Sequence, residues 1–221
     1  VEKVEEVNSN SVQFEFYTGE KRCYLVISVE TSSLCMFIND KKLFGGSNTG
    51  RFIQYLRKHI IGARLERIVQ VPYERIVHFK FVKSFPEKKI LIGTVEMMGR
   101  NSNFYFWTPH NRKTVYPLKP IDISASNDRP VLPGAPFSLP PMNSKRTGIN
   151  LENREEFFNM VGQEPTWKDI FQNIKPMSPH VAKEIMNRSD VRNPESVYGN
   201  FREFMRKYKE QDFEPELYSA E

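Results

Sequence analysis

Alternating hydrophobic and polar residues between positions 65 and 98 predict three antiparallel strands joined by two tight turns. The strand segments are rich in Val, Ile, Leu and Phe, whereas the turns contain Pro and charged residues that interrupt a sheet. Such short turns favour a meander in which each strand pairs with the next. The expected strands are Leu65–Val71, Arg75–Lys83 and Ile90–Met98, and the expected turns are Pro72-Tyr73-Glu74 and Pro86-Glu87-Lys88.

Two polar segments should lie at the same end of this meander, because alternate turns of antiparallel strands share an end of the sheet. One segment is Glu74-Arg75, and the other is Gly99-Arg-Asn-Ser102 after the third strand. Planar donors flanked by carboxylates suit the binding of a nucleotide or phosphate better than the packing of a core. We call the side chains at this end the rim, which contains Arg75, Arg100, Asn101 and Asn103 with the carboxylates Glu74 and Glu96.

The residues outside the meander predict further strands and one helix. Two segments around Tyr-Thr-Gly-Glu alternate in hydrophobicity, as expected for a hairpin, and a third short strand follows them. Four apolar residues between positions 52 and 60 recur on one face of a helix, which Asn48 or Thr49 would cap and Gly62 would end. The expected strands are Val12–Phe16, Cys23–Val29 and Leu34–Ile38, with a later hairpin formed by Asn103–Thr108 and Thr114–Leu118.

A proline-rich segment and a series of short helices follow. Five prolines between Pro130 and Pro141 predict an extended covering segment or a linker. Ser178-Pro179 and Asn193-Pro194 each place Pro at the first position of a helix. We therefore expect an α+β protein, with a twisted antiparallel β-rich domain and a packed helix in residues 1–145, and a small all-α domain in residues 150–210. The expected helices are Asn153–Val161, Thr166–Asn173, Ser178 to about Arg188, and Asn193 to Lys209.

The positive charge of the chain is concentrated in its β-rich part. Residues 1–148 contain 22 Lys and Arg against 13 Asp and Glu, a net charge of +9, whereas residues 149–221 contain 10 against 14, a net charge of −4. Arg57 and Lys58 lie on the polar face of the expected helix, and Arg64 follows it. Any one of these charges is explained by a solvated surface, but a domain with this excess favours a polyanion as partner.

The composition indicates a folded protein and limits its chemistry. The chain has 39% hydrophobic residues and no run of about 18 apolar residues, so we expect no membrane-spanning segment. The first six residues form no secretory or transit signal, and Cys23 and Cys35, which could face each other on neighbouring strands, are expected to be reduced in a cytosolic protein. We find no motif for catalytic residues, a cofactor or a small-molecule substrate. No metal site is expected either, because the histidines are dispersed at His59, His78, His110 and His180.

Several segments also follow the motifs of one protein family, in that family's order. Phe52–Ile60 with Gly62-Ala-Arg64 is similar to a helix ending in Leu-Arg-Lys-His and Gly-x-Arg, and Met177–Ile185 is similar to the start of a helix-hairpin-helix module. The other segments are Gln70–Phe79, Glu96–Asn103, Arg129–Gly134 and Pro140-Pro141. Together these segments resemble the N-terminal region of the fibronectin-binding protein A-like (NFACT) family, and they extend over nearly the whole chain.

The resemblance implies a function in the cytoplasm. Family members include factors that add untemplated C-terminal tails to nascent chains on stalled large ribosomal subunits. The family's acidic-Arg pair contacts the anticodon region of tRNA, and the role transfers by position to Glu74 and Arg75. The resemblance also implies a helix-hairpin-helix domain in residues 150–210, the start of a coiled coil in residues 211–221, and tRNA and the rRNA of the large subunit as partners. The expected nucleic-acid contacts are Glu74, Arg75, Arg100, Asn101, Arg57, Lys58 and Arg64, with structural support from Glu96, Gly99 and Asn103.

Three residues depart from the family's motifs. Glu74 replaces the usual Asp, which keeps the charge on a longer side chain, and Asn101 replaces a His, which keeps a hydrogen-bonding group that does not titrate. Pro176 replaces a Gly of the helical hairpin, which counts against a close approach of that hairpin to a phosphate.

Alternatives to this function remain open. The family's name implies a fibronectin-binding surface adhesin, against which the absence of a signal peptide counts. The family is also distantly similar to DNA glycosylases of the formamidopyrimidine type, which need an N-terminal amine nucleophile and a zinc finger that are not recognisable here. In the simplest interpretation, Glu74-Arg75 is a turn ion pair and Gly99–Asn103 is a hairpin turn.

Overall fold

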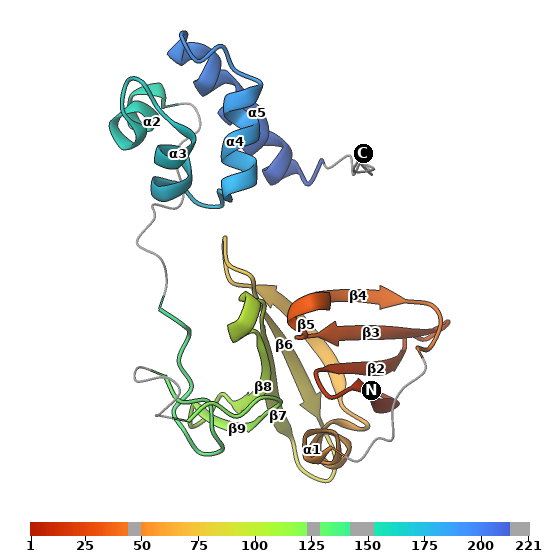
Figure 1. Ribbon diagram of the computed structural model, residues 1–221. Helices are drawn as coiled ribbons and strands as arrows, with labels where there is room; N and C mark the ends of the chain where they lie inside the picture. Colours follow the sequence, from red (N-terminus) through yellow and green to blue (C-terminus); the bar gives the residue numbers. More distant parts are fainter. Residues whose placement is uncertain (44–49, 123–128, 142–152, 213–221) are drawn as a thin grey trace. The chain divides into compact units, whose positions relative to one another are not determined.

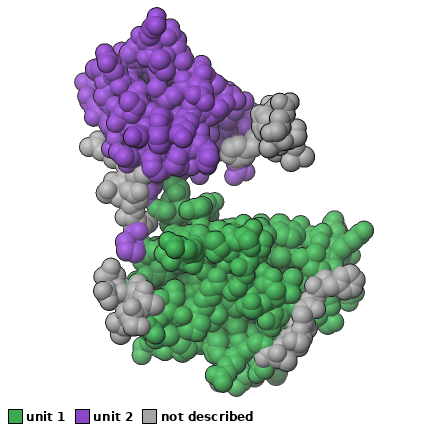
Figure 2. Space-filling model, viewed as in Figure 1, with its two compact units in different colours: residues 1–140 green, residues 141–221 purple. Residues whose placement is uncertain are grey.

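The computed structural model describes residues 1–43, 50–122, 129–141 and 153–212. The chain forms two compact units, residues 1–140 and residues 141–221, which are green and purple in Figure 2. In the described residues, unit 1 contains two antiparallel sheets and one α-helix, and unit 2 contains four α-helices (Figure 1). The expected α+β class is confirmed.

Each sheet of unit 1 is a meander in which every strand pairs with its neighbours in the sequence. This connectivity follows from the short turns between the strands, which allow only antiparallel pairing. The predicted strands are confirmed in both sheets. The four-stranded sheet contains β1 (Lys3–Asn8), β2 (Ser11–Tyr17), β3 (Arg22–Ser28) and β4 (Cys35–Asn39); the five-stranded sheet contains β5 (Arg64–Gln70), β6 (Ile76–Lys83), β7 (Lys89–Glu96), β8 (Asn103–Thr108) and β9 (Lys113–Pro117).

Strand β1 was not predicted from the sequence. It lies at the edge of the four-stranded sheet, and its only fully buried side chain is Val4. Acidic residues occupy much of the rest of the strand, and Glu5 pairs with Lys42 at 2.8 Å. Charges are common on edge strands because they oppose pairing with another sheet, and here they remove the alternation that identifies a strand.

The two sheets of unit 1 share one aromatic core. Phe14 of β2 packs against Phe81 of β6 and Phe104 of β8, with a separation of 6.0 Å between ring centroids in each pair. The helix α1 (Arg51–Ile60) contributes Phe52, whose ring lies 5.5 Å from that of Phe104. The apolar face predicted for this helix therefore packs into the core, and its polar face stays exposed.

Two local expectations for unit 1 are wrong. Gly50 occupies the N-cap position of α1, where Asn48 or Thr49 was expected; those two residues lie outside the described part of the chain. Cys23 and Cys35 do not face each other, because the register pairs Cys35 with Ser28 and leaves Cys23 beyond the last residue pair of β3 and β4. Both thiols are free.

The proline-rich segment covers the outer face of the five-stranded sheet, which is one of the two roles expected for it. Phe137 stacks on Trp107 of β8 with ring centroids 4.0 Å apart, and Val131 packs beside Tyr105. The backbone of Val131 exchanges two hydrogen bonds with that of Ile121. Both faces of β8 are therefore buried, which explains its uninterrupted aromatic run.

The four predicted helices of unit 2 are confirmed. Each begins at a residue whose side chain accepts a hydrogen bond from a backbone N–H in the first turn: Asn153, Thr166, Ser178 and Asn193. These caps satisfy donors that have no partner within the helix. The helices enclose a separate core of buried aromatic and aliphatic residues. They are α2 (Arg154–Val161), α3 (Trp167–Asn173), α4 (Pro179–Asn187) and α5 (Pro194–Glu210).

The aromatic core predicts a marked loss of stability for Gly93→Ala. A Cβ atom on Gly93 would lie 3.0 Å from the ring of Phe106 and 3.1 Å from that of Phe104, both of which are fully buried. Overpacking of this kind costs about 1–3 kcal/mol, because the rings must leave their preferred positions. Urea unfolding followed by the fluorescence of Trp107, in a Trp167→Phe background, measures the loss in unit 1.

The same substitution in unit 2 provides the matched control. Gly199 lies on an exposed position of α5, and a Cβ atom there meets no other atom within 4 Å. Since Ala is the better helix former, Gly199→Ala should stabilise unit 2 by about 0.5–1 kcal/mol. Equal effects of the two substitutions would contradict the packing described for Gly93.

Candidate nucleic-acid interface

The two turns of the rim lie at the same end of the five-stranded sheet, as the meander predicted. The register pairs Ile76, the first residue of β6, with Glu96, the last residue of β7. Just beyond this pair, the backbone N–H of Met97 donates to the carbonyl of Arg75 at 2.9 Å. The segments before β6 and after β7 are therefore joined directly at the rim.

The turn between β5 and β6 is held by a glutamine that sequence analysis left without a role. The carbonyl of Val71 accepts a hydrogen bond from the N–H of Glu74 at 3.0 Å, which closes the turn. The side-chain amide of Gln70 donates to the carbonyl of Glu74 at 2.9 Å. Tyr73 has a φ of 60°, a left-handed conformation that costs an L-residue about 1–2 kcal/mol. The turn thus holds an unfavourable backbone conformation two residues before Arg75.

The second turn of the rim is the 3₁₀ helix η2 (Gly99–Asn101). Gly99 has a φ of 59°, which a glycine adopts without steric cost. Backbone hydrogen bonds from Asn101 to Met98 and from Ser102 to Gly99 fix the turn. Arg100 and Asn101 are exposed at its tip. In the described part of the chain, the side chains of Arg75 and Arg100 have no hydrogen-bond or ion-pair partner.

A buried network of three side chains supports the rim from below. Glu96 accepts hydrogen bonds from the guanidinium of Arg129 at 2.6 Å and from the hydroxyl of Tyr105 at 2.5 Å. The exposed fractions of the Glu96 and Arg129 side chains are 4% and 12%. Burial, followed by the charge of Glu96, raises the pKa of Tyr105, so its hydroxyl stays a donor. Glu96 was expected to give structural support, but the sequence did not show that its partner would be Arg129.

Glu96 and Asn103 lie at the rim end of the sheet, but neither is available to a ligand at its surface. Asn103 is fully buried, and its amide donates to the carbonyl of Lys119 at 2.7 Å. The amide oxygen accepts from the backbone of Phe104 and of Lys119. The exposed chemistry of the rim therefore comes from Arg75, Arg100 and Asn101, with Glu74 half-buried.

The structure does not bring Arg57, Lys58 and Arg64 to the rim. Arg64 pairs with Val82 at the other end of β6, roughly 20 Å from Ile76 at about 3.3 Å per residue. Arg57 donates to the carbonyl of Val4, and Lys58 lies near the same far end of the sheet, where α1 is seen in Figure 1. These cations form a second basic region because α1 packs at the end of the sheet opposite the rim.

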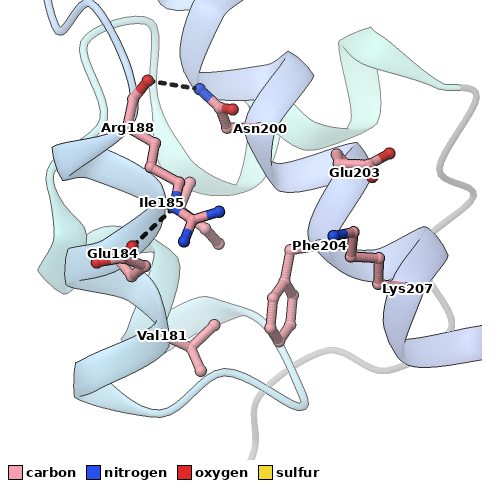
Figure 3. Close-up of a pocket in the computed structure, with 8 residues that line it drawn as sticks. All are labelled: Val181, Glu184, Ile185, Arg188, Asn200, Glu203, Phe204 and Lys207. Atoms are coloured by element: carbon pink, nitrogen blue, oxygen red, sulfur yellow. Dashed lines mark hydrogen bonds and ion pairs between the residues drawn. The ribbon is translucent and has the colours of Figure 1, made fainter. Parts of the chain in front are cut away.

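Unit 2 contains a pocket of about 270 Å³ between α4 and α5 (Figure 3). Its apolar lining comes from Val181, Ile185 and Phe204. Opposite charges alternate around it, and Arg188 pairs with Glu184 at 2.7 Å. This balance of charge does not favour a polyanion, so the rim of unit 1 is the stronger candidate for nucleic-acid binding.

Among the described residues, no three or more His, Cys, Asp and Glu side chains form a group that could hold a metal ion. No helix in the described part of the chain is long and apolar enough to cross a membrane.

Comparison with known proteins identifies relatives of this chain. A model of the family described as NFACT N-terminal and middle domains matches residues 1–221. The protein named Rqc2 homolog RqcH of Bacillus subtilis (strain 168) is 26% identical over 220 residues, which are 98% of this chain and 39% of that protein. A protein of the same name from Streptococcus pneumoniae serotype 2 is 27% identical over 152 residues, 68% of this chain and 27% of that protein. The chain thus spans about two fifths of the length of the Bacillus relative.

Solved structures share the fold. The N-terminal part of the fibronectin/fibrinogen-binding protein from Streptococcus suis superposes with a TM-score of 0.78 at 20% identity, covering 93% of this chain and 76% of that one. The N-terminal domain of fibronectin-binding protein PavA from Streptococcus pneumoniae gives a TM-score of 0.75 at 18% identity, covering 96% and 77%. At these identities the likeness establishes the fold alone.

Proposed function

Because the chain belongs to the family of NFACT N-terminal and middle domains, we propose that it is the tRNA- and ribosome-binding part of a ribosome-associated quality-control factor. Its relatives named Rqc2 homolog RqcH support this assignment. In this proposal the whole protein acts in the cytoplasm on stalled large ribosomal subunits, where it supports untemplated tailing of nascent chains. The chain itself acts by binding, without a catalytic group of its own.

One observation carries the proposal: two arginines that have no partner among the described residues are exposed in turns at the same end of the sheet, next to the buried network of Glu96. Arg75 and Arg100 have no partner in the described residues, while Glu96 beneath them is occupied by Arg129 and Tyr105. A surface arginine held in place without a carboxylate partner is well suited to a phosphate or a base edge. An arginine that only stabilised the turn would be expected to pair locally.

The chemistry of the rim fits an unpaired nucleotide loop. Arg75 would donate to a phosphate or a base edge, and Glu74 would orient it or accept from a base amine. Asn101 offers both a donor and an acceptor beside Arg100, as recognition of a base edge requires. The anticodon region of tRNA presents such unpaired bases, which makes it the ligand we propose for the rim.

Two finer assignments complete the proposal. Arg57, Lys58 and Arg64 would contact RNA separately from the rim, because they lie at the other end of the sheet. The segment of α3 and α4, joined by the short connection through Pro176, would be the helix-hairpin-helix module of the family. A net charge of −4 in residues 149–221 supports nucleic-acid binding by unit 1 rather than by this module.

Binding measurements with three ligands test the proposal. The 221-residue chain is titrated with tRNA, with fibronectin and with a DNA duplex containing an abasic site. We expect tRNA to bind with a dissociation constant of about 10⁻⁶ M or lower and a strong dependence on salt, because phosphate contacts release counterions. Fibronectin should bind weakly or not at all, and the duplex should remain intact.

The other outcomes select the alternatives. Tight binding of fibronectin without binding of tRNA would support the adhesin function. Cleavage of the abasic duplex, abolished by a point mutation in the chain, would support the glycosylase function. Either result would overturn the proposed role in ribosome quality control.

A further inference from the structure

A second pocket of unit 1 lies at the end of the five-stranded sheet opposite the rim. Its volume is about 370 Å³, which is in the range of pockets that bind small molecules. Its lining comes from three segments that are distant in sequence: the last turns of α1, the start of β7 with the residue before it, and the hairpin of β8 and β9. The proposed function leaves this pocket without a role.

The opening of the pocket is basic. Lys88 lines it from the β6–β7 turn, Lys89 from the first position of β7, and His110 from the β8–β9 turn. Lys58 and Lys83 lie close enough to act on the imidazole of His59, another lining residue. Among the described residues, none of the four lysines has an ion-pair partner within 4.0 Å.

The carboxylates nearest to these lysines do not neutralise the pocket. Glu66 of β5 feels the charge of Lys88, but its own ion pairs are with Lys80 at 2.5 Å and Arg64 at 3.5 Å. Glu87 is exposed in the turn beside Lys88 and does not line the pocket. The described lining therefore contains basic groups and no carboxylate, so its potential favours an anion.

The interior of the pocket is aromatic and aliphatic. The ring of His59 stacks on that of Tyr55 at 4.3 Å, and Tyr55 stacks in turn on Tyr116 at 5.1 Å. Leu91 and Val115 supply apolar surface beside this stack. Burial and then the charges of the surrounding lysines lower the pKa of His59, which favours the uncharged form of its ring. An uncharged imidazole at the end of an aromatic stack is a surface on which a nucleobase can stack.

We propose that this pocket binds a nucleotide, with the lysines of the opening holding the phosphate and the His59 stack with its apolar neighbours holding the base. An anion alone would need only the lysines, and an apolar ligand would gain nothing from them. A nucleotide combines a planar ring with a charged group at a short distance, as the pocket does. The source is either a free nucleotide or an unpaired nucleotide of an RNA strand, and the site does not depend on tRNA binding at the rim.

The four histidines of the chain make the test specific. Their ring signals are followed by NMR while the chain is titrated with 5′-AMP, adenosine, inorganic phosphate and hexa-adenylate RNA. We expect AMP to shift His59 and His110, and its phosphate to raise the pKa of His59 by offsetting the lysine charges. His78, on β6, and His180, in unit 2, do not line the pocket and should not respond. Adenosine and phosphate should each bind about 10-fold more weakly than AMP, since each makes only part of the contacts.

Variants of the lining lysines test whether the NMR shifts with AMP arise from binding in the pocket. Lys88→Ala with Lys89→Ala should weaken AMP binding about 10-fold or more, because two charge-assisted contacts are lost. The matched control is Lys3→Ala with Lys41→Ala, two exposed lysines of which one lies in β1 and the other just after β4; this variant should bind AMP like the unmodified chain. Binding in the pocket is read from His59 and His110, which line it at the end of the sheet opposite the rim, so a failure of the rim and a failure of the pocket can be distinguished.

Each of the remaining outcomes either supports or overturns nucleotide binding by the pocket. Tighter binding of hexa-adenylate than of AMP identifies an RNA strand as the source, and equal binding identifies a free nucleotide; both support the proposal. Equal binding of phosphate and AMP would reduce the pocket to an anion site and overturn it. No change at His59 with 10 mM AMP, or equal changes at all four histidines, would overturn it as well.

Discussion

Replacing Arg129 by Met should lower the free energy of unfolding of unit 1 by about 3–5 kcal/mol, the largest effect expected of any substitution near the rim. The guanidinium of Arg129 neutralises Glu96 at 2.6 Å, and both side chains are largely buried. Without it, a carboxylate would remain in a protein interior with only the hydroxyl of Tyr105 as a partner. Burying an uncompensated charge costs more than the loss of the ion pair itself.

A double variant separates the cost of burying an unpaired carboxylate from the cost of lost packing. Glu96→Gln with Arg129→Met removes both charges, keeps an acceptor for Tyr105, and should recover much of the stability lost in the single variant. Arg22→Met is the control, because Arg22 pairs with Glu15 while its own side chain is 67% exposed, and the loss should stay below about 1 kcal/mol.

Urea unfolding reports these variants through Trp107, in a Trp167→Phe background. If Arg129→Met were as mild as the exposed control, the Glu96 network would not be what supports the rim.

The fold of unit 1 was largely predictable because its strands are short, regular and joined by tight turns. The alternation of residues around Pro72 and Pro86 fixed the meander, and the meander fixed which turns share an end of the sheet. The pattern failed at β1, where charges on an edge strand remove the alternation. The N-cap of α1 was also misplaced, because Gly50 carries no side chain to indicate the cap.

The position of the candidate site at one end of the sheet was predictable from the sequence, but the burial and the partners of its side chains were not. Sequence spacing brought Arg75 and Arg100 together, but it could not show that Asn103 turns inward to bind the backbone of Lys119. The partner of Glu96 was missed because Arg129 lies 33 residues away, beyond the reach of strand patterns. The one available signal was the position of Arg129 directly before the proline-rich segment, which covers the same sheet.

Arg57, Lys58 and Arg64 lie apart from the rim because of the position of α1 in the fold, which the sequence patterns do not show. Helix α1 joins the last strand of one sheet to the first strand of the next, so it packs at the end where β5 begins. The rim lies where β5 ends. Naming Arg57, Lys58 and Arg64 together with the rim residues as nucleic-acid contacts therefore combined two regions that the length of β6 keeps apart.

Removing both rim arginines should weaken tRNA binding more at low salt than at high salt. The factor by which the variant binds more weakly than the unmodified chain should be about 25 times larger at 0.1 M salt than at 1 M salt. Each arginine that neutralises a phosphate of a single-stranded loop contributes about 0.7 to the slope of log affinity against log salt concentration. Arg75→Ala with Arg100→Ala should thus flatten that slope by about 1.4. Both side chains are exposed and unpaired in the described residues, so their loss should leave the melting temperature unchanged.

The salt series also distinguishes two ways in which Arg75 can act. If Arg75 contacts a base edge rather than a phosphate, Arg75→Ala alone should cost about 1–3 kcal/mol and reduce discrimination among tRNAs, with little change in slope. Lys3→Ala with Lys41→Ala is the charge-matched control, and it measures what the loss of two positive charges does through the net charge alone. If the rim variants stay folded and bind every tRNA like this control, the rim consists only of two turns, and the RNA contacts of unit 1 must be sought elsewhere on its surface.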